Sequence, residues 1–378
     1  MMAQLGVTLY LPVMPAIVGA LNMSEVEGYN SLLMYLGGAV VPLTFAVRVI
    51  RAFGRSTVLL AFCCIFLSAS LMSILARYDT GFYLSRLLQG FGAGGAALIG
   101  RALLSEIFSG ARLAKHLTLL SYSFVFALIM GQVAGGHVVS FGRWEVISFI
   151  MAFGSVTTIF LVLSVKNTLC GLDTCERQRT NSKKYAFIIR KRHFYLPVIL
   201  GGCGYGVFVV FQGVGVYVFE MLMGWGSSEY GMFGTWLGLA YFLGTLSVRI
   251  ALKSISLNAL SVVGSSVMIL AALIFLLTIL AYVKQHFVVM AYLAVWYAQA
   301  MMYPCVASMA VKNYPGIESM MLFSFLQQLV ALLLGTLASL VIPVGMHGVA
   351  WLAFGLGGLG AAVAILLSIK RSFYGYAG

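Results

Sequence analysis

Long apolar segments separated by short polar ones run through the whole sequence. Most have about 20 residues or more, the length that a helix needs to cross the hydrocarbon core of a bilayer. Only helices or closed barrels satisfy backbone groups in lipid, and the segments lack strand alternation. They cover 3–22, 28–47, 56–76, 80–104, 116–139 and 145–165, and, after the polar stretch 166–193, 195–222, 228–251, 257–282, 286–311, 318–342 and 347–369. The pattern predicts an all-α integral membrane protein with about twelve transmembrane helices.

Composition excludes a soluble globule. Of the 378 residues, 61% are hydrophobic and 9% are charged, whereas a soluble chain carries about 25% charged residues. The net charge of +13 does not indicate nucleic-acid binding, because the basic residues lie in short loops and form no amphipathic face. The cysteines fall mostly inside apolar segments, and the CGLDTC stretch at 170–175 lacks the spacing of a zinc knuckle or redox pair. We therefore expect no disulfide framework, metal or cofactor.

The first apolar segment, 3–22, is interpreted as a membrane span and not as a signal peptide. It has neither a basic stretch before it nor a small-residue cleavage site after it. It is only just long enough to cross a bilayer. An encoded start further upstream therefore stays open.

The distribution of Lys and Arg indicates which helix ends face the cytoplasm. If both termini are cytoplasmic, eighteen of the 23 basic residues lie inside, three lie outside, and Arg86 and Arg101 lie within a helix. The inner residues are Arg48, Arg51, Arg55, Arg112, Lys115, Lys166, Arg177, Arg179, Lys183, Lys184, Arg190, Lys191, Arg192, Arg249, Lys253, Lys312, Lys370 and Arg371; the outer ones are Arg77, Arg143 and Lys284. The positive-inside rule thus predicts cytoplasmic N- and C-termini.

The sequence divides into two similar halves. Residues 1–165 and 194–378 each hold six predicted helices, and the basic stretch 166–193 joins them as a cytoplasmic linker. Each half has a basic loop after its second helix, at Arg48 to Arg55 and at Arg249 to Lys253. Repeats of this kind are typical of secondary carriers, whose substrate site lies near the bilayer midplane between the halves. We therefore expect a small-molecule carrier.

Four stretches carry a resemblance to a known family: LYLPVMPAI at 9–17, RLLQGFGAGGA at 86–96, GQVAGG at 131–136, and the segment from Tyr303 to Gln328 that begins YPCVASMAVKNYPGIESMM. They resemble the major facilitator superfamily, and within it the Bcr/CflA-like branch of bicyclomycin and chloramphenicol resistance proteins. The resemblance implies proton-coupled multidrug efflux by alternating access, in the bacterial inner membrane. It also implies a monomer whose partners are a small-molecule substrate, protons and the lipid bilayer.

Three residues depart from the pattern of that family. Thr8 stands where the branch has an acidic residue, Arg51 stands where the superfamily has the Asp of Asp-Arg-x-Gly-Arg, and Gln132 replaces the proline of the antiporter motif. Each departure weakens the inference of proton coupling. Two alternatives therefore stay open: an uncoupled facilitator or importer of a small polar metabolite, and a transport-dead membrane sensor or scaffold.

Arg86 is the sharpest single candidate, because an ionisable group inside a span usually faces the bundle interior or a wet cavity. In the family this Arg is thought to influence the protonation of an acid in the first helix. The alternative is an Arg that extends to the interface. Glu220 is the acid closest to a span interior, and a carboxylate in a dry site can carry a proton. A solvated helix end is the alternative for Glu220.

Uncharged polar residues inside the spans suggest a binding chamber for an amphipathic solute. The predicted cavity and coupling residues are Arg86, Gln89, Tyr10, Thr8, Tyr122, Gln132, Tyr205, Gln212, Glu220, Tyr303 and Gln327, with Tyr217, Trp236, Tyr241, Tyr297 and Gln328 as further candidates. Gly90, Gly92, Gly131, Gly135 and Gly136 are predicted to allow close helix packing or hinge motion. Pro12, Pro15, Pro42 and Pro304 predict helix breaks or kinks. No Ser-His-Asp, HExxH or clustered acid site occurs, so we do not expect an enzyme.

Overall fold

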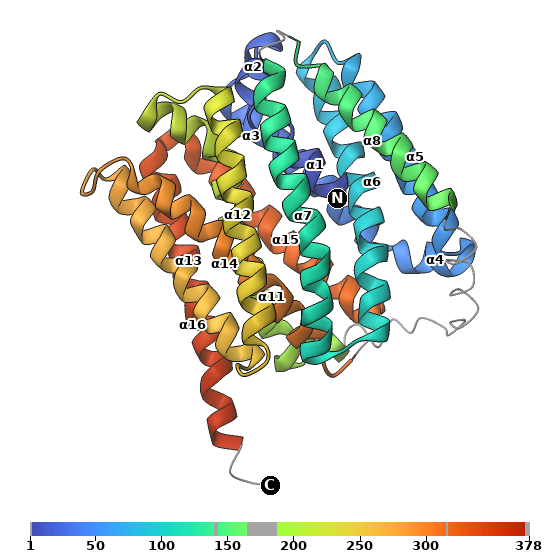
Figure 1. The fold of residues 1–378 in the computed structure, drawn as a ribbon, viewed down its shortest axis with the longest axis vertical. Helices are drawn as coiled ribbons and strands as arrows, with labels where there is room; N and C mark the ends of the chain where they lie inside the picture. The colour runs from blue at the N-terminus through green and yellow to red at the C-terminus, as the bar shows by residue number, and fades with distance from the viewer. Residues whose placement is uncertain (1, 140–142, 165–186, 315–316, 375–378) are drawn as a thin grey trace.

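A computed structural model describes residues 2–139, 143–164, 187–314 and 317–374 (Figure 1). Most of the predicted linker at 166–193, including Cys170 and Cys175, lies outside these residues. Before the linker the helices are α1 (Met2–Thr8), α2 (Met14–Ala20), α3 (Glu25–Val40), α4 (Ala46–Phe53), α5 (Arg55–Ile74), α6 (Asp79–Ile107), α7 (Gly110–Val138) and α8 (Val146–Ser164). After it they are α11 (Arg192–Met223), α12 (Ser227–Ala251), α13 (Leu257–Ile279), α14 (Phe287–Val311), α15 (Ile317–Val341) and α16 (Met346–Tyr374). Short 3-10 turns follow α3 and α15, η1 (Val41–Thr44) and η3 (Ile342–Val344).

The helices match the predicted spans in order and in place. Within the described residues, 9 helices are long and apolar enough to cross a membrane. The three remaining predicted spans correspond to α1 with α2, to α3 with η1, and to α6. The prediction of an all-α membrane fold with about twelve spans is therefore confirmed.

The first span is a broken helix. Helix α1 ends at Thr8 and α2 begins at Met14, and the turn between them contains Pro12. Pro15 lies in the first turn of α2, where its missing N–H costs no helical hydrogen bond. In Figure 1 the described chain starts at mid-height of the bundle and α2 lies at its top. Helix α16 ends at the bottom, where α6 and α12 also end.

Two of the other prolines behave differently from Pro12. Pro304 lies inside the continuous helix α14, and Pro42 lies in η1, immediately after α3 ends. Proline therefore breaks the chain most sharply in the first span, where the backbone of residues 9–13 leaves the α-helical path.

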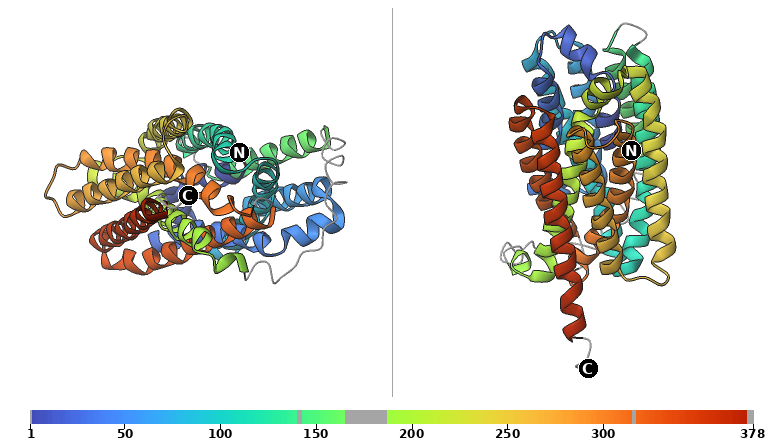
Figure 2. Two further views of the ribbon diagram at one scale, coloured as in Figure 1. Left: turned by 90° about the horizontal axis from the view of Figure 1, so that it is seen from below. Right: turned by 90° about the vertical axis from the view of Figure 1, so that its left-hand side faces the viewer.

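The outward faces of the bundle are apolar. On α8, for example, the exposed fractions of Phe153 and Phe160 are 75% and 70%. Large apolar side chains in such numbers on the outside are expected when lipid is the solvent. Figure 2, seen from below, shows the later helices gathered on one side and the earlier helices on the other.

Two seams join the earlier helices to the later ones. Helix α12 packs along α7, and α15 packs against α3 and α6. The α7–α12 seam approaches closely because glycines face each other: a Cβ atom on Gly136 would lie 3.0 Å from the Cα atom of Gly231. A side chain cannot fit in that space. This seam, defined here by Gly136, Gly231, Gly234 and Gly238 with their neighbours, is called the glycine seam below.

Glycine also brings helices together within the earlier half. A Cβ atom on Gly90 of α6 would collide with the carbonyl oxygen of Tyr35 on α3. Gly92 packs against Phe62 and Phe66 of α5 in the same way. On α7, Gly131 and Gly135 lie against Thr8 and Leu9. All five glycines predicted as packing or hinge residues thus lie at helix contacts.

Candidate functional site

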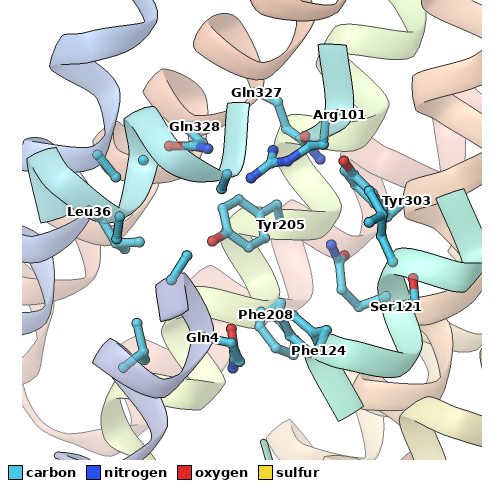
Figure 3. A pocket seen from close by; sticks show the side chains of 18 of the residues that line it. Gln4, Leu36, Arg101, Ser121, Phe124, Tyr205, Phe208, Tyr303, Gln327 and Gln328 are labelled. Carbon is cyan, nitrogen blue, oxygen red and sulfur yellow. The ribbon is translucent and has the colours of Figure 1, made fainter. Parts of the chain in front are cut away.

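A cavity of about 350 Å³ lies between the two groups of helices (Figure 3). Its walls come from α1, α3, α6 and α7 on one side and from α11, α12, α14 and α15 on the other. The residues labelled in the close view are Gln4, Leu36, Arg101, Ser121, Phe124, Tyr205, Phe208, Tyr303, Gln327 and Gln328. The volume falls within the range of about 300–1,000 Å³ that small organic ligands occupy.

Several polar atoms on the cavity wall form no hydrogen bond with the described protein. They are Gln4 Nε2, Gln212 Nε2, the Tyr303 hydroxyl and Gln328 Oε1. Gln327 differs, because its Nε2 donates to the carbonyl oxygen of Gly201 at 3.2 Å. A buried polar group without a partner is costly, so such groups mark places where a ligand or water completes the hydrogen bonding.

Aromatic rings form much of the remaining wall. The rings of Tyr205 and Phe208 are stacked with centroids 6.1 Å apart, and Phe124 lies 6.5 Å from Phe208. These three side chains come from α7 and α11, so they belong to both groups of helices. The cavity thus offers an apolar, aromatic surface together with a few hydrogen-bonding groups, the combination typical of small-molecule sites.

Arg101 brings a positive charge to this cavity. It is the only charged residue among the described residues that line the cavity, and no Asp or Glu is among them. In Figure 3 its guanidinium group lies beside Tyr205 and Gln327. With the described residues Arg101 forms neither a hydrogen bond nor an ion pair. The sequence placed Arg101 inside a span but did not select it as a site residue.

Arg86 lies outside the cavity lining, in a buried cluster. One guanidinium nitrogen donates to the Gly6 carbonyl oxygen at 2.7 Å and to Gln89 Oε1 at 2.9 Å. The rings of Tyr10 and Tyr35 lie on the guanidinium, with centroids 4.3 and 4.6 Å from its central carbon. Arg86 therefore fixes α1 against α6 and α3, and its described partners are all neutral.

The rest of this cluster is also uncharged. The Tyr10 hydroxyl lies 3.1 Å from the hydroxyl oxygens of both Ser73 and Ser148. The Thr8 hydroxyl is 3.0 Å from the Gln4 carbonyl oxygen and 3.1 Å from the Ala127 carbonyl oxygen. Thr8 therefore bonds to backbone carbonyls at the position where the family pattern has a carboxylate.

The predicted site residues separate into three groups. Tyr205, Gln212, Tyr303, Gln327 and, from the further candidates, Tyr241 and Gln328 line the cavity. Arg86, Gln89, Tyr10 and Thr8 form the buried cluster behind it.

The other candidates do not reach the cavity. Gln132 lies in the glycine seam against Gly234, and Tyr122 packs on Phe242. Glu220 is exposed at the end of α11, because only one turn of helix follows it.

The further candidates Tyr217, Trp236 and Tyr297 also lie outside the lining. Trp236 faces outward with 61% of its side chain exposed, and the Tyr297 hydroxyl donates to Ser247 at 2.9 Å. The sequence missed Gln4, Gln299 and Phe208 as lining residues. Gln4 and Gln299 share one signal that could have found them, since both are uncharged polar residues inside predicted spans.

Comparison with known proteins gives the same fold. The sequence profile of the Major Facilitator Superfamily matches residues 1–333. The solved structure of the proton:xylose symporter XylE has a TM-score of 0.74 at 14% identity, and the match covers 97% of this chain and 94% of that one. That of the human organic anion transporter MFSD10 has a TM-score of 0.65, also at 14% identity, with coverages of 97% and 96%. At such identities these similarities show the fold alone.

Curated relatives include the multidrug resistance protein MdtL of Escherichia coli O17:K52:H18 and that of Shigella dysenteriae serotype 1. Each is 27% identical over 227 residues, which is 60% of this chain and 57% of the relative. The matched region thus spans a little over half the length of these relatives. From the profile match over most of its length and the twelve-span fold, the chain belongs to the major facilitator superfamily and is a multi-pass membrane transporter, not an enzyme.

Proposed function

We propose that this protein is a secondary carrier that exports drug-like organic solutes across a bacterial inner membrane by alternating access. It works as a monomer of two six-helix halves, 1–165 and 194–378. The observation that carries the proposal is the cavity between these halves, whose wall holds polar atoms without protein partners. Both halves contribute to the wall, so a movement of one half against the other changes access to it.

Contacts between the halves above and below the cavity support this mechanism. On α15, Gln327 lines the cavity. Gly335 follows eight residues later, and its carbonyl oxygen accepts from the Tyr29 hydroxyl of α3 at 3.2 Å. Glu318 precedes Gln327 by nine residues and forms an ion pair with Arg51 at 3.0 Å. At 1.5 Å per residue these contacts lie about 12 and about 14 Å from Gln327, in opposite directions. We therefore expect that breaking the Tyr29–Gly335 contact opens the cavity to one side of the membrane and that breaking the Arg51–Glu318 pair opens it to the other.

Export of drug-like solutes is supported by the relatives named multidrug resistance protein and by the Bcr/CflA-like motifs at 9–17 and 86–96. A second candidate is an uncoupled facilitator or importer. One observation favours it: the described contacts of Arg86 and Thr8 are neutral. No described carboxylate therefore lies where the family resemblance implies an acid whose protonation the Arg influences. A transport-dead scaffold does not explain the cavity. Buried polar groups without protein partners are costly, and a scaffold would bind no solute that completes their hydrogen bonds.

The test is flux of chloramphenicol, with and without a pH gradient, in liposomes containing the purified full-length protein. The export proposal predicts saturable flux that a gradient drives uphill and that an uncoupler abolishes. Saturable flux that only equilibrates, whatever the gradient, selects the uncoupled candidate. If chloramphenicol and a panel of other drug-like solutes show no saturable flux with folded protein, the carrier proposal is wrong.

A further inference from the structure

We propose that the cavity binds organic anions and that the Arg101 guanidinium group recognises their carboxylate or comparable acidic group. This inference rests on the proposed carrier function and specifies its substrate class. The ligand would have an aromatic or otherwise apolar body and one anionic end. Its main support is the unpaired charge of Arg101 on the cavity wall.

The position of Arg101 inside a span makes its charge costly. Arg101 lies on α6 six residues before its last residue, Ile107, about 9 Å from that end of the helix. A guanidinium group stays protonated in proteins. A charge inside the membrane region is costly, and such residues pair with an opposite charge or serve a transport pathway. Arg101 has no described protein partner, so a ligand of opposite charge would stabilise it.

The described acidic residues, Asp and Glu alike, lie outside the cavity lining. Glu318 bonds to Arg51, Glu27 caps the first turn of α3, and Glu229 caps the first turn of α12. A lipophilic cation in the cavity would therefore meet the positive charge of Arg101 with no described carboxylate beside it. Coulomb repulsion at short range in a medium of low polarity disfavours that cation.

The contrast with Arg86 shows that Arg101 is not simply a second structural arginine. Arg86 is 1% exposed, donates to Gly6 and Gln89, and contacts two aromatic rings. Arg101 is half-buried, faces the cavity and has none of these contacts. Arginine presents its N–H donors in a planar fork that matches a carboxylate with two hydrogen bonds.

The remainder of the cavity wall offers neutral donors and aromatic rings. Gln212 is 4% exposed, and its amide nitrogen has no hydrogen-bond partner. The Tyr303 hydroxyl is in the same situation. Both groups can donate to oxygen atoms of a ligand. Tyr205 and Phe208 offer ring faces for its apolar part. One fixed cation, neutral donors and aromatic faces together match an amphipathic anion.

The experiment uses three probes that share one ring system: 2-naphthoate, the neutral 2-naphthamide, and the cation 2-naphthylmethylammonium. Their flux is measured in liposomes containing the purified full-length protein. We expect kcat/KM for naphthoate to exceed that for naphthamide at least tenfold, and the ammonium probe to be poorest. Arg101→Gln should reduce kcat/KM for naphthoate at least tenfold and leave that for naphthamide nearly unchanged, whereas Arg101→Lys should retain part of the preference. Arg112→Gln removes the same charge from an exposed position on α7 and serves as the matched control.

The outcomes separate this inference from the carrier proposal. Equal or better flux of naphthamide or of the ammonium probe in the wild-type protein overturns the inference, and this comparison needs no variant. A folded Arg101→Gln protein that keeps the naphthoate preference overturns it as well. Chloramphenicol flux without naphthoate flux overturns the inference and leaves the carrier intact. If folded wild-type protein transports none of these solutes, both the inference and the carrier proposal are wrong.

Discussion

Arg51 and Glu318 form an ion pair with a nitrogen–oxygen distance of 3.0 Å that joins α4 to the first turn of α15. The family pattern has Asp where this chain has Arg51. In this chain α4 supplies the base of the ion pair, and α15 supplies the acid, Glu318. A carboxylate in the first turn of a helix also interacts favourably with the helix dipole. The departure at Arg51 thus coincides with an intact electrostatic contact between the halves.

Reversing the charge of Arg51 should destabilise the protein, and reversing both charges should restore part of the loss. Arg51→Glu places two carboxylates together, whereas Arg51→Glu with Glu318→Arg restores attraction but loses the favourable helix-dipole term. The two side chains are 21% and 10% exposed, so we expect a coupling of about 1 kcal/mol. Thermal unfolding in detergent measures it as a double-mutant cycle. Arg48→Glu, at an exposed position of α4, is the control. Additive effects of the two reversals would show that the pair contributes nothing.

Replacing Arg86 should impair both stability and transport, and lysine should not substitute for it. Arg86→Lys keeps the charge but cannot reproduce the bonds to Gly6 and Gln89 together with stacking on Tyr10 and Tyr35. A hydrogen bond to a charged group contributes about 1.5–3 kcal/mol, and a buried acceptor left without its donor adds to the loss. We expect lower thermal stability and at least tenfold slower flux for Arg86→Lys and Arg86→Ala. Wild-type stability in Arg86→Lys would contradict the role of this residue in holding α1.

Adding one methyl group at Gly90 should be far more harmful than adding one at Gly100 of the same helix. A Cβ atom at Gly90 collides with backbone of α3, whereas at Gly100 no atom lies within 4 Å. Alanine is the better helix former, so Gly100→Ala should be neutral or stabilising by up to about 1 kcal/mol. Gly90→Ala should lower the yield of folded protein and its unfolding temperature. Equal thermal stability of the two variants would refute the close contact.

Removing the Tyr303 hydroxyl should weaken transport without weakening the fold. Because this hydroxyl has no protein hydrogen bond, Tyr303→Phe removes no intramolecular contact and avoids the cost of an unpaired buried group. We expect an unchanged or raised unfolding temperature and a KM for transported solute raised several-fold. Tyr297→Phe is the comparison, because its hydroxyl donates to Ser247 outside the cavity and its loss should affect stability and not KM. A lower unfolding temperature for Tyr303→Phe, with unchanged KM, would contradict a ligand-binding role.

The fold was predictable because lipid imposes simple constraints. A span must be long, apolar and helical, and its cytoplasmic end is marked by Lys and Arg. These constraints act on whole segments, so errors at single residues did not matter. The break in the first span was also visible in the sequence as Pro12. The end of α3 was likewise visible as Pro42, whereas the separation of η1 from α4 at Phe45 was not, since no Gly or Pro marks it.

The cavity was only partly predictable, because a helix has one inward face and the sequence does not indicate which residue occupies it. Gln212 and Trp236 were equally plausible candidates, yet one lines the cavity and the other faces outward. Motif strength was also misleading about position: Arg86 carries the family signature and lies behind the wall, whereas Arg101 carries none and lies on it. Packing between helices far apart in sequence decides such cases.

The glycine seam bears on the proposed movement of one half against the other. Interlocked side chains resist rotation, since each must leave its groove before the helices can turn. At Gly136 and Gly231 bare backbone lies against bare backbone, and nothing there has to disengage. Rotation of α7 against α12 is therefore least hindered at Gly136 and Gly231, whereas the side chains of Gln132 and Ile129 lie against Gly234 and Gly238 further along the seam. We expect a bulky residue at Gly231 to hinder this rotation. It would leave the cavity unchanged, because Gly231 is not among the residues that line it.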